Sequence, residues 1–360
     1  MVLGLVCITG SGRAAIATRL SELSAQATRL GNTRNTDYRL TDLLPEMVED
    51  YLRVKDGDMS DCFPWPWPEF QKEAGPLAKD DYVVLCGRPK SMKTMVLTCL
   101  VAFYAMMGIR VLVYTKEMTP KRIAFRTVAF MNEFPYREYR NGELPPELEA
   151  RLFAMLDKQV WPGDPPIYLS GKDVPGGHDT VEWLWGKCKQ HRPQIVFVDG
   201  LYLMSDEEAA RRGGADWNRV TNISRKLRAL SNDENLPVIA TTQASDEEEQ
   251  DEKKVDKVKY GRAIKQDATL FLQPMIRRAK KQLALVTGGT REFECEGIVL
   301  NAIPCLPFTF AGFLSSQEIV AAEAEDEAAY AKAVQIGHAR GAAQVQEELQ
   351  RPARGRKKPA

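Results

Sequence analysis

The chain has 360 residues, of which 44% are hydrophobic and 27% charged, and its 49 basic residues balance 49 acidic ones. This composition is ordinary for a globular protein with a large core, and zero net charge excludes a global field that would attract nucleic acid or a membrane surface. Seven cysteines without a C-x-x-C pair argue against a disulfide framework or a zinc site and favour a reducing, cytosolic setting, and no apolar run approaches the about 18 residues that cross a bilayer.

Residues 1–60 are predicted to form a helical appendage. Apolar residues recur at helical spacing in 20–30 and in 40–52, on either side of a polar stretch. The following segment, CFPWPWP at 62–68, is rich in proline and is incompatible with a regular helix. We interpret it as the lead-in to the main domain.

Strands and helices alternate over the main domain, which is predicted to extend over residues 61–312. Strands are expected at 82–86, 109–115, 167–170, 195–198, 238–242, 269–273, 283–286 and 297–301. Helices are expected at 94–107, 119–132, 146–159 and 180–191 and over 220–230. Such alternation predicts an α/β fold with a mostly parallel central sheet covered by helices on both faces.

A charged tail follows, at residues 313–360. Its composition shifts to Ala, Glu and Gln, which predicts an exposed helix over 321–350. The last segment, 351–360, is basic and contains Pro and Gly, so we expect it to be disordered.

The most informative segment is DYVVLCGRPKSMKT at 81–94. It predicts a buried strand, a tight loop and a helix that opens with Lys93 and Thr94, which is the architecture of a phosphate-binding loop. Backbone N–H groups and the helix N-terminus bind phosphates, the lysine adds a point charge, and the threonine hydroxyl reaches Mg²⁺. The candidate nucleotide-binding residues are Gly87, Arg88, Pro89, Lys90, Ser91, Met92, Lys93 and Thr94.

Met92 departs from the pattern G-x-x-x-x-G-K-[ST], which has glycine at this position. If the position requires a positive φ, methionine costs on the order of 1–2 kcal/mol, whereas at a helical φ the cost is small. Lys90, which the pattern does not require, adds a second cation near the phosphates.

Three further polar residues follow predicted strands, where open parallel sheets place their ligands. Asp199 ends an apolar strand and is a candidate Mg²⁺ ligand. Glu117 follows the second strand, and it is either a general base that activates water or a solvated charge at a helix start. Gln243 is either a sensor of the γ-phosphate or an ordinary polar residue that leaves the sheet.

Two basic features complete the set, and the first of them also lies at a strand end. Arg291, in the turn TGGTRE, is either an arginine that reaches the nucleotide of a neighbouring subunit or a surface arginine in a hairpin. The segment 257–262 contains Lys259, Gly261 and Arg262, and basic Gly-containing loops suit a phosphate backbone. The acidic run 246–251 just before it would repel DNA.

In this order the motifs resemble those of the DnaB-type replicative helicases, whose motor domain is RecA-like. The resemblance covers roughly residues 61–312. The small size of the chain and its variant phosphate loop resemble those of phage or plasmid members of the family. The stretches that carry it are GRPKSMKT at 87–94, YTKEMT at 114–119, QIVFVDGLYLM at 194–204, NISRKLRAL with LPVIATTQ within 222–243, and GRAIKQDA at 261–268.

The resemblance implies an ATP-hydrolysing, Mg²⁺-dependent DNA helicase that forms a hexameric ring around single-stranded DNA, in the cytoplasm, with a primase or a helicase loader as candidate partners. It also implies roles by position. Lys93 and Thr94 bind phosphate and Mg²⁺, Glu117 is the catalytic glutamate, Asp199 the Walker B acid, Gln243 the sensor, Arg291 the arginine finger acting in trans, and Lys259, Gly261 and Arg262 the contacts to the DNA backbone.

The chain also departs from the family pattern. Gly289 stands where such proteins place a basic residue, two before the arginine finger, and the first 60 residues are too short for the amino-terminal collar domain, although 43–54 fits a linker helix that packs on an adjacent subunit. Two alternatives remain open: a RecA-like recombinase that forms filaments, and a non-hydrolysing ATP-binding DNA scaffold or loader. The predicted catalytic residues are Lys93, Glu117, Asp199, Gln243 and Arg291, and their joint presence favours an enzyme.

Overall fold

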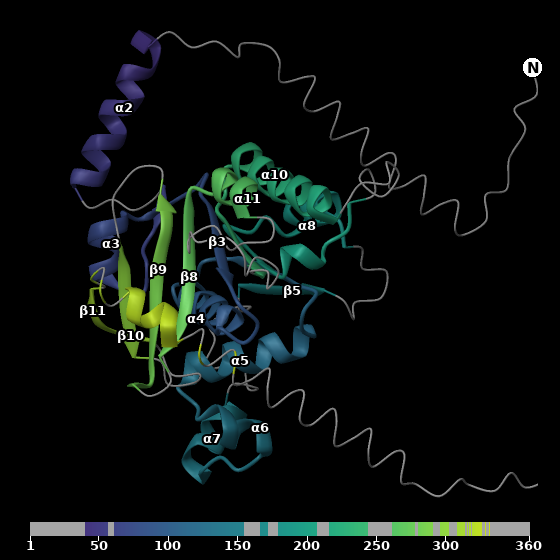
Figure 1. The fold of residues 1–360 in the computed structure, drawn as a ribbon. Coiled ribbons are helices and arrows are strands. Elements are labelled where there is room, and N and C mark those ends of the chain that lie inside the picture. The colour runs from purple at the N-terminus through teal and green to yellow at the C-terminus, as the bar shows by residue number, and fades with distance from the viewer. Residues whose placement is uncertain are drawn as a thin grey trace, which may run out of the picture.

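A nine-stranded sheet forms the centre of the molecule (Figure 1). The computed structural model describes residues 40–56, 61–154, 166–171, 179–206, 216–243, 261–277, 280–290, 296–301 and 308–313 and parts of 315–331. The strands are β3 (Tyr82–Gly87), β4 (Val111–Thr115), β5 (Ile167–Gly171), β6 (Ile195–Asp199), β7 (Val238–Gln243), β8 (Leu270–Arg277), β9 (Gln282–Thr290), β10 (Gly297–Asn301) and β11 (Thr309–Phe313).

The sheet has a parallel and an antiparallel part, in the order β11-β10-β9-β8-β3-β7-β6-β4-β5. All neighbours from β8 to β5 are parallel, whereas β8, β9, β10 and β11 pair antiparallel. The prediction of a mostly parallel sheet is therefore confirmed. Parallel strands end at the same edge, so the polar residues that follow them come together.

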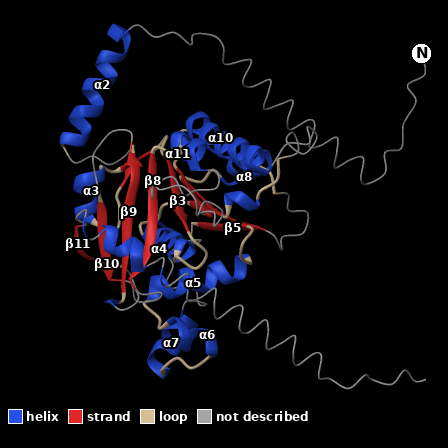
Figure 2. Cartoon of the chain, in the orientation of Figure 1, coloured by secondary structure: helices blue, strands red, loops and turns tan. Residues whose placement is uncertain are grey.

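Helices cover both faces of the sheet (Figure 2). The labelled helices are α2 (Leu40–Lys55), α3 (Pro68–Ala74), α4 (Lys93–Met106), α5 (Pro120–Asn132), α6 (Tyr136–Asn141), α7 (Pro146–Ala154), α8 (Val181–His191), α10 (Asp216–Glu234) and α11 (Gly261–Asp267), with the short 3₁₀ turn η2 (Leu201–Leu203). Helices α4 and α5 pack on one face, and α8 and α10 on the other. A short two-stranded sheet, β1 (Cys62–Phe63) with β2 (Leu77–Ala78), lies beside α3 in the chain.

Strand β3 shows why a hydrophobic core cluster forms on each face of the sheet. Val83 and Leu85 lie in the core cluster with residues of α4 and α5, while Tyr82 and Val84 lie in a second cluster with α8 and α10. Because successive side chains of a strand point to opposite faces, a strand buried on both faces must be apolar throughout. Helix α4 is apolar almost all round for the same reason, since most of its residues are buried.

The Pro/Trp segment before β3 is part of the core. Trp65 and Trp67 are 3% and 1% exposed, and both rings pack edge-on against Phe70. The indole N–H of Trp67 donates to the carbonyl of Phe308, at 2.7 Å. This bond joins the two ends of the predicted main domain.

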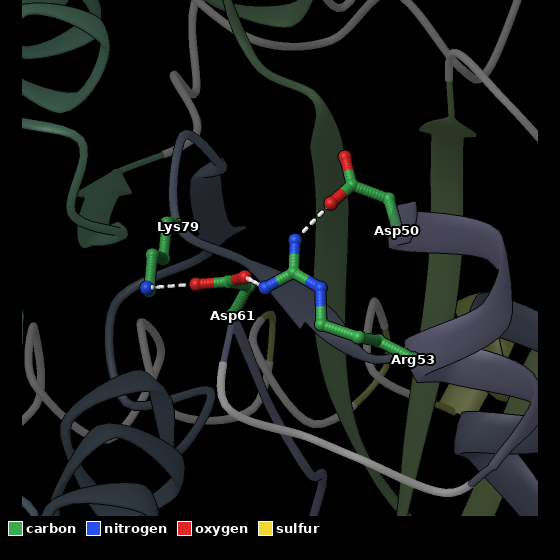
Figure 3. A network of polar contacts seen from close by, with 4 residues as sticks. All are labelled: Asp50, Arg53, Asp61 and Lys79. Atoms are coloured by element: carbon green, nitrogen blue, oxygen red, sulfur yellow. Dashed lines mark hydrogen bonds and ion pairs between the residues drawn. The ribbon is translucent and has the colours of Figure 1, made fainter. Parts of the chain in front are cut away.

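Helix α2 lies to one side of the sheet (Figure 1), and its existence confirms the helical spacing of residues 40–52. Ion pairs connect its last turn to the body: Arg53 pairs with Asp50 on the helix and with Asp61, which in turn pairs with Lys79 (Figure 3). The helix leaves a set of large apolar side chains exposed: Leu40, Leu44, Met47, Val48, Tyr51 and Leu52.

Several predicted bounds were wrong, each for a local reason. Strand β8 continues through Pro274, because β3 pairs only with Leu270–Leu272, so the proline lies where β8 needs no donor towards β3. Strand β9 continues through the expected turn TGGT, with a register shift opposite Phe271, and a Cβ at Gly288 would lie 2.7 Å from the Phe271 ring. The second strand begins at Val111, two residues later than expected, after Gly108 at φ 77°.

Short elements were not predicted from the sequence: β1, β2, α3, α6, η2, α11 and β11. Gly261 and Arg262, which were expected in a loop, open helix α11. The expected exposed helix from residue 321 is helical where described, at 319–325, but Ala322 is fully buried against β9 and β10, so this part of the tail packs on the sheet. Predictions for residues 1–39 and 332–360 lie outside the described residues.

Candidate functional site

The predicted site residues meet at one edge of the sheet because of strand register. Gly87 at the end of β3 pairs with Gln243 at the end of β7, and Thr115 at the end of β4 pairs with Asp199 at the end of β6. Glu117 follows two residues after β4. The carboxyl ends of four adjacent strands therefore form one site, as expected for an open parallel sheet.

The loop between β3 and α4 depends on backbone conformation. Met92 caps α4 at φ 67° and ψ 15°, and Lys90 has φ 68°. Pro89, whose ring fixes a negative φ, precedes Lys90. Ser91, between the two left-handed residues, donates its N–H to the Arg88 carbonyl at 3.2 Å, which closes the loop into a tight turn.

The position of Met92 therefore does require a positive φ. Methionine at this position therefore carries the strain cost of a left-handed conformation rather than the small cost of a helical one. Lys90 is left-handed as well, so one short loop contains two strained residues other than glycine. Gly87 is needed for a different reason: a Cβ there would lie 2.4 Å from the Ser91 Oγ atom.

Lys93 points its ammonium group into this loop. Its Nζ donates to the carbonyl oxygens of Gly87, at 2.6 Å, and Arg88, at 2.8 Å, and the side chain is 7% exposed. The hydroxyl of Ser91 is buried and has no hydrogen-bond partner in the part of the protein that the structure describes. An ammonium group, an unpaired hydroxyl and the N-terminus of α4 fit a phosphate chain.

Asp199 is fully buried and accepts three hydroxyl hydrogen bonds. Oδ1 accepts from Thr94 at 3.0 Å and from Thr241 at 3.3 Å, and Oδ2 accepts from Thr115 at 3.2 Å. Burial raises the pKa of Asp199, the charge of Glu117 raises it further, and the three hydroxyls act to lower it. The carboxylate and the Thr94 hydroxyl are oxygen ligands of the kind that Mg²⁺ prefers, so this pair fits the ion.

Glu117 is exposed and lies against the turn that follows Asp199. The hydroxyl of Tyr202 donates to Oε2 at 3.4 Å, and a Cβ at Gly200 would lie 3.6 Å from the Glu117 Cβ. Burial raises the pKa of Tyr202, and the neighbouring charge of Glu117 raises it further, so the phenol stays a donor at neutral pH.

Sequence reasoning missed Thr115, Thr241 and Tyr202. The two threonines end or nearly end strands β4 and β7, which was an available signal, since a hydroxyl there faces the same edge as Asp199. Tyr202 lies in a 3₁₀ turn that no pattern indicated.

The remaining predicted residues are placed only in part. Gln243 is half-buried beside Gly87 by register. Gly261 and Arg262 open α11, but their side chains are not described, and Lys259 and Arg291 lie outside the described residues. Across the part of the chain that the structure describes, no cluster of three metal-ligating side chains occurs, and no helix is long and apolar enough to cross a membrane.

Comparison with known proteins identifies the family of the chain. The family model described as DnaB-like helicase C terminal domain matches residues 67–285, which is more than half of the chain. That match includes the loop, Glu117, Asp199 and Gln243.

Curated relatives are helicases. The chain is 23% identical over 248 residues to a probable plasmid replicative DNA helicase of Chlamydia trachomatis, covering 68% of this chain and 53% of that protein. It is 25% identical over 242 residues to the replicative DNA helicase DnaB of Rhodothermus marinus, covering 63% and 24%. The chain thus spans about half the length, or less, of the curated relatives it matches.

Solved structures confirm the RecA-like fold. One of them, an isolated ATPase domain, superposes with a TM-score of 0.63 at 17% identity, covering 75% of this chain and 98% of that one. A second, a DnaB-like replicative helicase described together with its interactions with primase, superposes with a TM-score of 0.61 at 17% identity, covering 83% and 76%.

Proposed function

The chain belongs to the family of DnaB-like helicase C-terminal domains, and from this premise we propose that it is an ATP-driven motor that moves along single-stranded DNA as a ring and unwinds duplex DNA. The observation that carries the proposal is the contact between the Thr94 hydroxyl and the Asp199 carboxylate, at 3.0 Å, next to a lysine held in the loop. This is the arrangement that Mg²⁺-dependent nucleotide hydrolysis requires.

Each residue of the site has a role in this proposal. The loop N–H groups and Lys93 bind the phosphates of ATP, and Thr94 and Asp199 hold Mg²⁺, which neutralises charge on the β- and γ-phosphates when bound. Glu117 orients and deprotonates the attacking water. Gln243, which pairs with Gly87 by register, senses the loss of the γ-phosphate. Arg291 completes the site of a neighbouring subunit.

Exposed Glu117 and buried Asp199 suit different tasks. Asp199 is surrounded by hydroxyl donors and is inaccessible to bulk water, as an ion-holding carboxylate should be. Glu117 has one side open to solvent, from which the attacking water comes. The two carboxylates are close enough for the charge of Glu117 to act on the pKa of Asp199, so a bound cation relieves repulsion between them.

The exposed apolar side chains of α2 support a ring. Leu40 and Tyr51 on this helix are 68% and 66% exposed. Among the described residues, the ion pair that joins the helix to the rest of its subunit comes from Arg53 in its last turn. We propose that this apolar side packs on an adjacent subunit of a hexamer. The segment with Lys259, Gly261 and Arg262 then contacts the DNA backbone inside the ring, and a primase or helicase loader is a candidate partner in the cytoplasm.

A forked DNA substrate tests the proposal. With ATP and Mg²⁺, the chain is expected to displace one strand, while Lys93→Ala does not. Mass photometry and negative-stain images of the same samples distinguish the architectures, since closed hexamers support the helicase and open filaments support a recombinase. DNA binding without strand displacement by either protein would favour a scaffold or loader and contradict the proposal.

A further inference from the structure

A 3₁₀ turn directly after Asp199 brings an aromatic hydroxyl against Glu117. In this turn, η2, the hydroxyl of Tyr202 donates to Glu117 Oε2 at 3.4 Å. This distance is longer than the about 2.5–3.0 Å of a formed O–H···O hydrogen bond. Catalytic hydrogen bonds are often long without substrate and shorten when it binds, so the geometry is that of a contact ready to form.

The backbone of Tyr202 is fixed from three sides. The Gly200 N–H donates to the Thr241 hydroxyl at 2.7 Å, which ties the start of the turn to β7. Leu201 is fully buried in the core, and Arg219 on α10 donates to the carbonyl oxygens of Tyr202, at 2.9 Å, and of Met204. The phenol therefore projects from a rigid part of the fold.

Gly200 allows this approach. Its φ is 92°, and a Cβ there would lie 3.2 Å from Leu203 and 3.6 Å from the Cβ of Glu117. A side chain at this position would be strained by its backbone, and its Cβ would crowd Leu203 while making ordinary contact with Glu117.

Glu117 has a well-fixed backbone but an exposed side chain. The preceding residue, Lys116, donates its N–H to the Asp199 carbonyl at 3.3 Å and forms an ion pair with Asp179. An exposed glutamate on such a backbone still samples several rotamers unless a partner selects one. Among the described residues, Tyr202 is the side chain that donates to this carboxylate.

We propose that Tyr202 is a positioning residue for Glu117: its hydroxyl holds Oε2 so that Oε1 faces the attacking water. The inference rests on the proposed function, because it requires Glu117 to be the base for ATP hydrolysis. Tyr202 itself touches neither water nor phosphate in this role.

The Tyr202→Phe variant tests the inference, because it removes the hydroxyl and keeps the ring. We expect kcat for ATP to fall by about tenfold, with KM within about twofold of the parent value, since the lost interaction orients the base rather than binding substrate. Tyr139→Phe, which keeps its ring contacts with Phe125 and Phe134 far from the site, is the matched control and leaves kcat unchanged.

A double variant separates positioning from a general structural effect. In a Glu117→Gln background, the Tyr202→Phe change is expected to have no further effect on the residual rate, because the residue it positions is gone. An equal fall in both backgrounds, or loss of binding of a fluorescent ATP analogue by Tyr202→Phe, would overturn the inference. So would an unchanged kcat.

Failure of the proposed function looks different. If the parent chain shows no turnover above Lys93→Ala, the proposed motor activity fails and this inference fails with it. If the parent turns over ATP and only the Tyr202→Phe results disagree, the inference alone is wrong.

Discussion

The phosphate loop and the Asp199 cluster lie at the same edge of the sheet, but different forces fix them. The loop holds its shape through backbone conformation, with Lys90 and Met92 in left-handed φ and Gly87 against Ser91. The cluster, which consists of Asp199 with Thr94, Thr115 and Thr241, is fixed by burial and hydroxyl donors. Substitutions should therefore act through strain in the loop and through charge in the cluster.

The largest expected effect is that of Asp199→Asn in the cluster. Loss of the carboxylate charge removes an Mg²⁺ ligand, and we expect ATP turnover to fall by at least about a hundredfold. The same variant is expected to melt at a higher temperature than the parent in the absence of nucleotide, because burial makes the ionised form costly, as the raised pKa of Asp199 indicates.

The pH dependence of melting tests the sign of the charge effect in this cluster. Since the pKa of Asp199 is raised in the folded state, its protonated form stabilises the fold below the ordinary aspartate range, and that stability is lost as pH rises through the raised pKa. Thermal melts of parent and Asp199→Asn should therefore diverge as pH rises above that range. Parallel curves would contradict a charge-based account of the cluster.

Thr241 and Thr242 test the role of hydroxyl donors at adjacent positions. Both are fully buried, but Thr241 bonds to Asp199 and Gly200, whereas the Thr242 hydroxyl has no partner among the described residues. Thr241→Val is expected to lower the free energy of unfolding by about 1–3 kcal/mol, because it leaves buried polar groups unpaired. Thr242→Val is the matched control and is expected to be neutral or stabilising, and denaturant unfolding measures both.

Met92 offers the corresponding test in the loop. Met92→Ala and Met92→Gly lose the same packing against the core cluster, but only glycine relieves the left-handed φ. We expect Met92→Gly to be more stable than Met92→Ala by about 1 kcal/mol, in spite of the greater freedom of glycine in the unfolded chain. Equal stabilities of Met92→Gly and Met92→Ala in denaturant melts would show that the left-handed φ at this position carries no strain.

The smallest effect is expected away from the sheet edge. Arg53→Gln breaks the exposed ion pairs with Asp50 and Asp61, and surface pairs contribute little to stability. The melting temperature should be unchanged at physiological salt. A large drop would mean that α2 is part of the folded core rather than an arm for a neighbouring subunit.

Much of the fold could be predicted because its signals are local. Apolar strands such as 195–198 and the stripe of Val220, Ile223, Leu227 and Leu230 on α10 are periodic in sequence, and the structure buries them. Strand β8 was less predictable, because it contains Pro274. The proline is tolerated since the pairing of β8 with β3 has already ended at Leu272. That fact belongs to the sheet, not to the segment.

The same division applies to the site. The loop and Asp199 were indicated by their patterns, whereas Glu117 and Gln243 received their predicted roles from the family resemblance. Register brings the ends of these strands together. Thr115, Thr241 and Tyr202 are ordinary residues in sequence and gain importance only through contacts across strands. The φ of Met92 was undecidable from sequence, because methionine fits a helix start as well as a left-handed cap.

Steady-state phosphate release in ATP and Mg²⁺, with and without single-stranded DNA, tests the central claim most directly. The parent chain is expected to turn over ATP, faster with DNA, and Lys93→Ala to show only background. Turnover no greater than that of Lys93→Ala, under both conditions, would contradict an active site at this edge of the sheet.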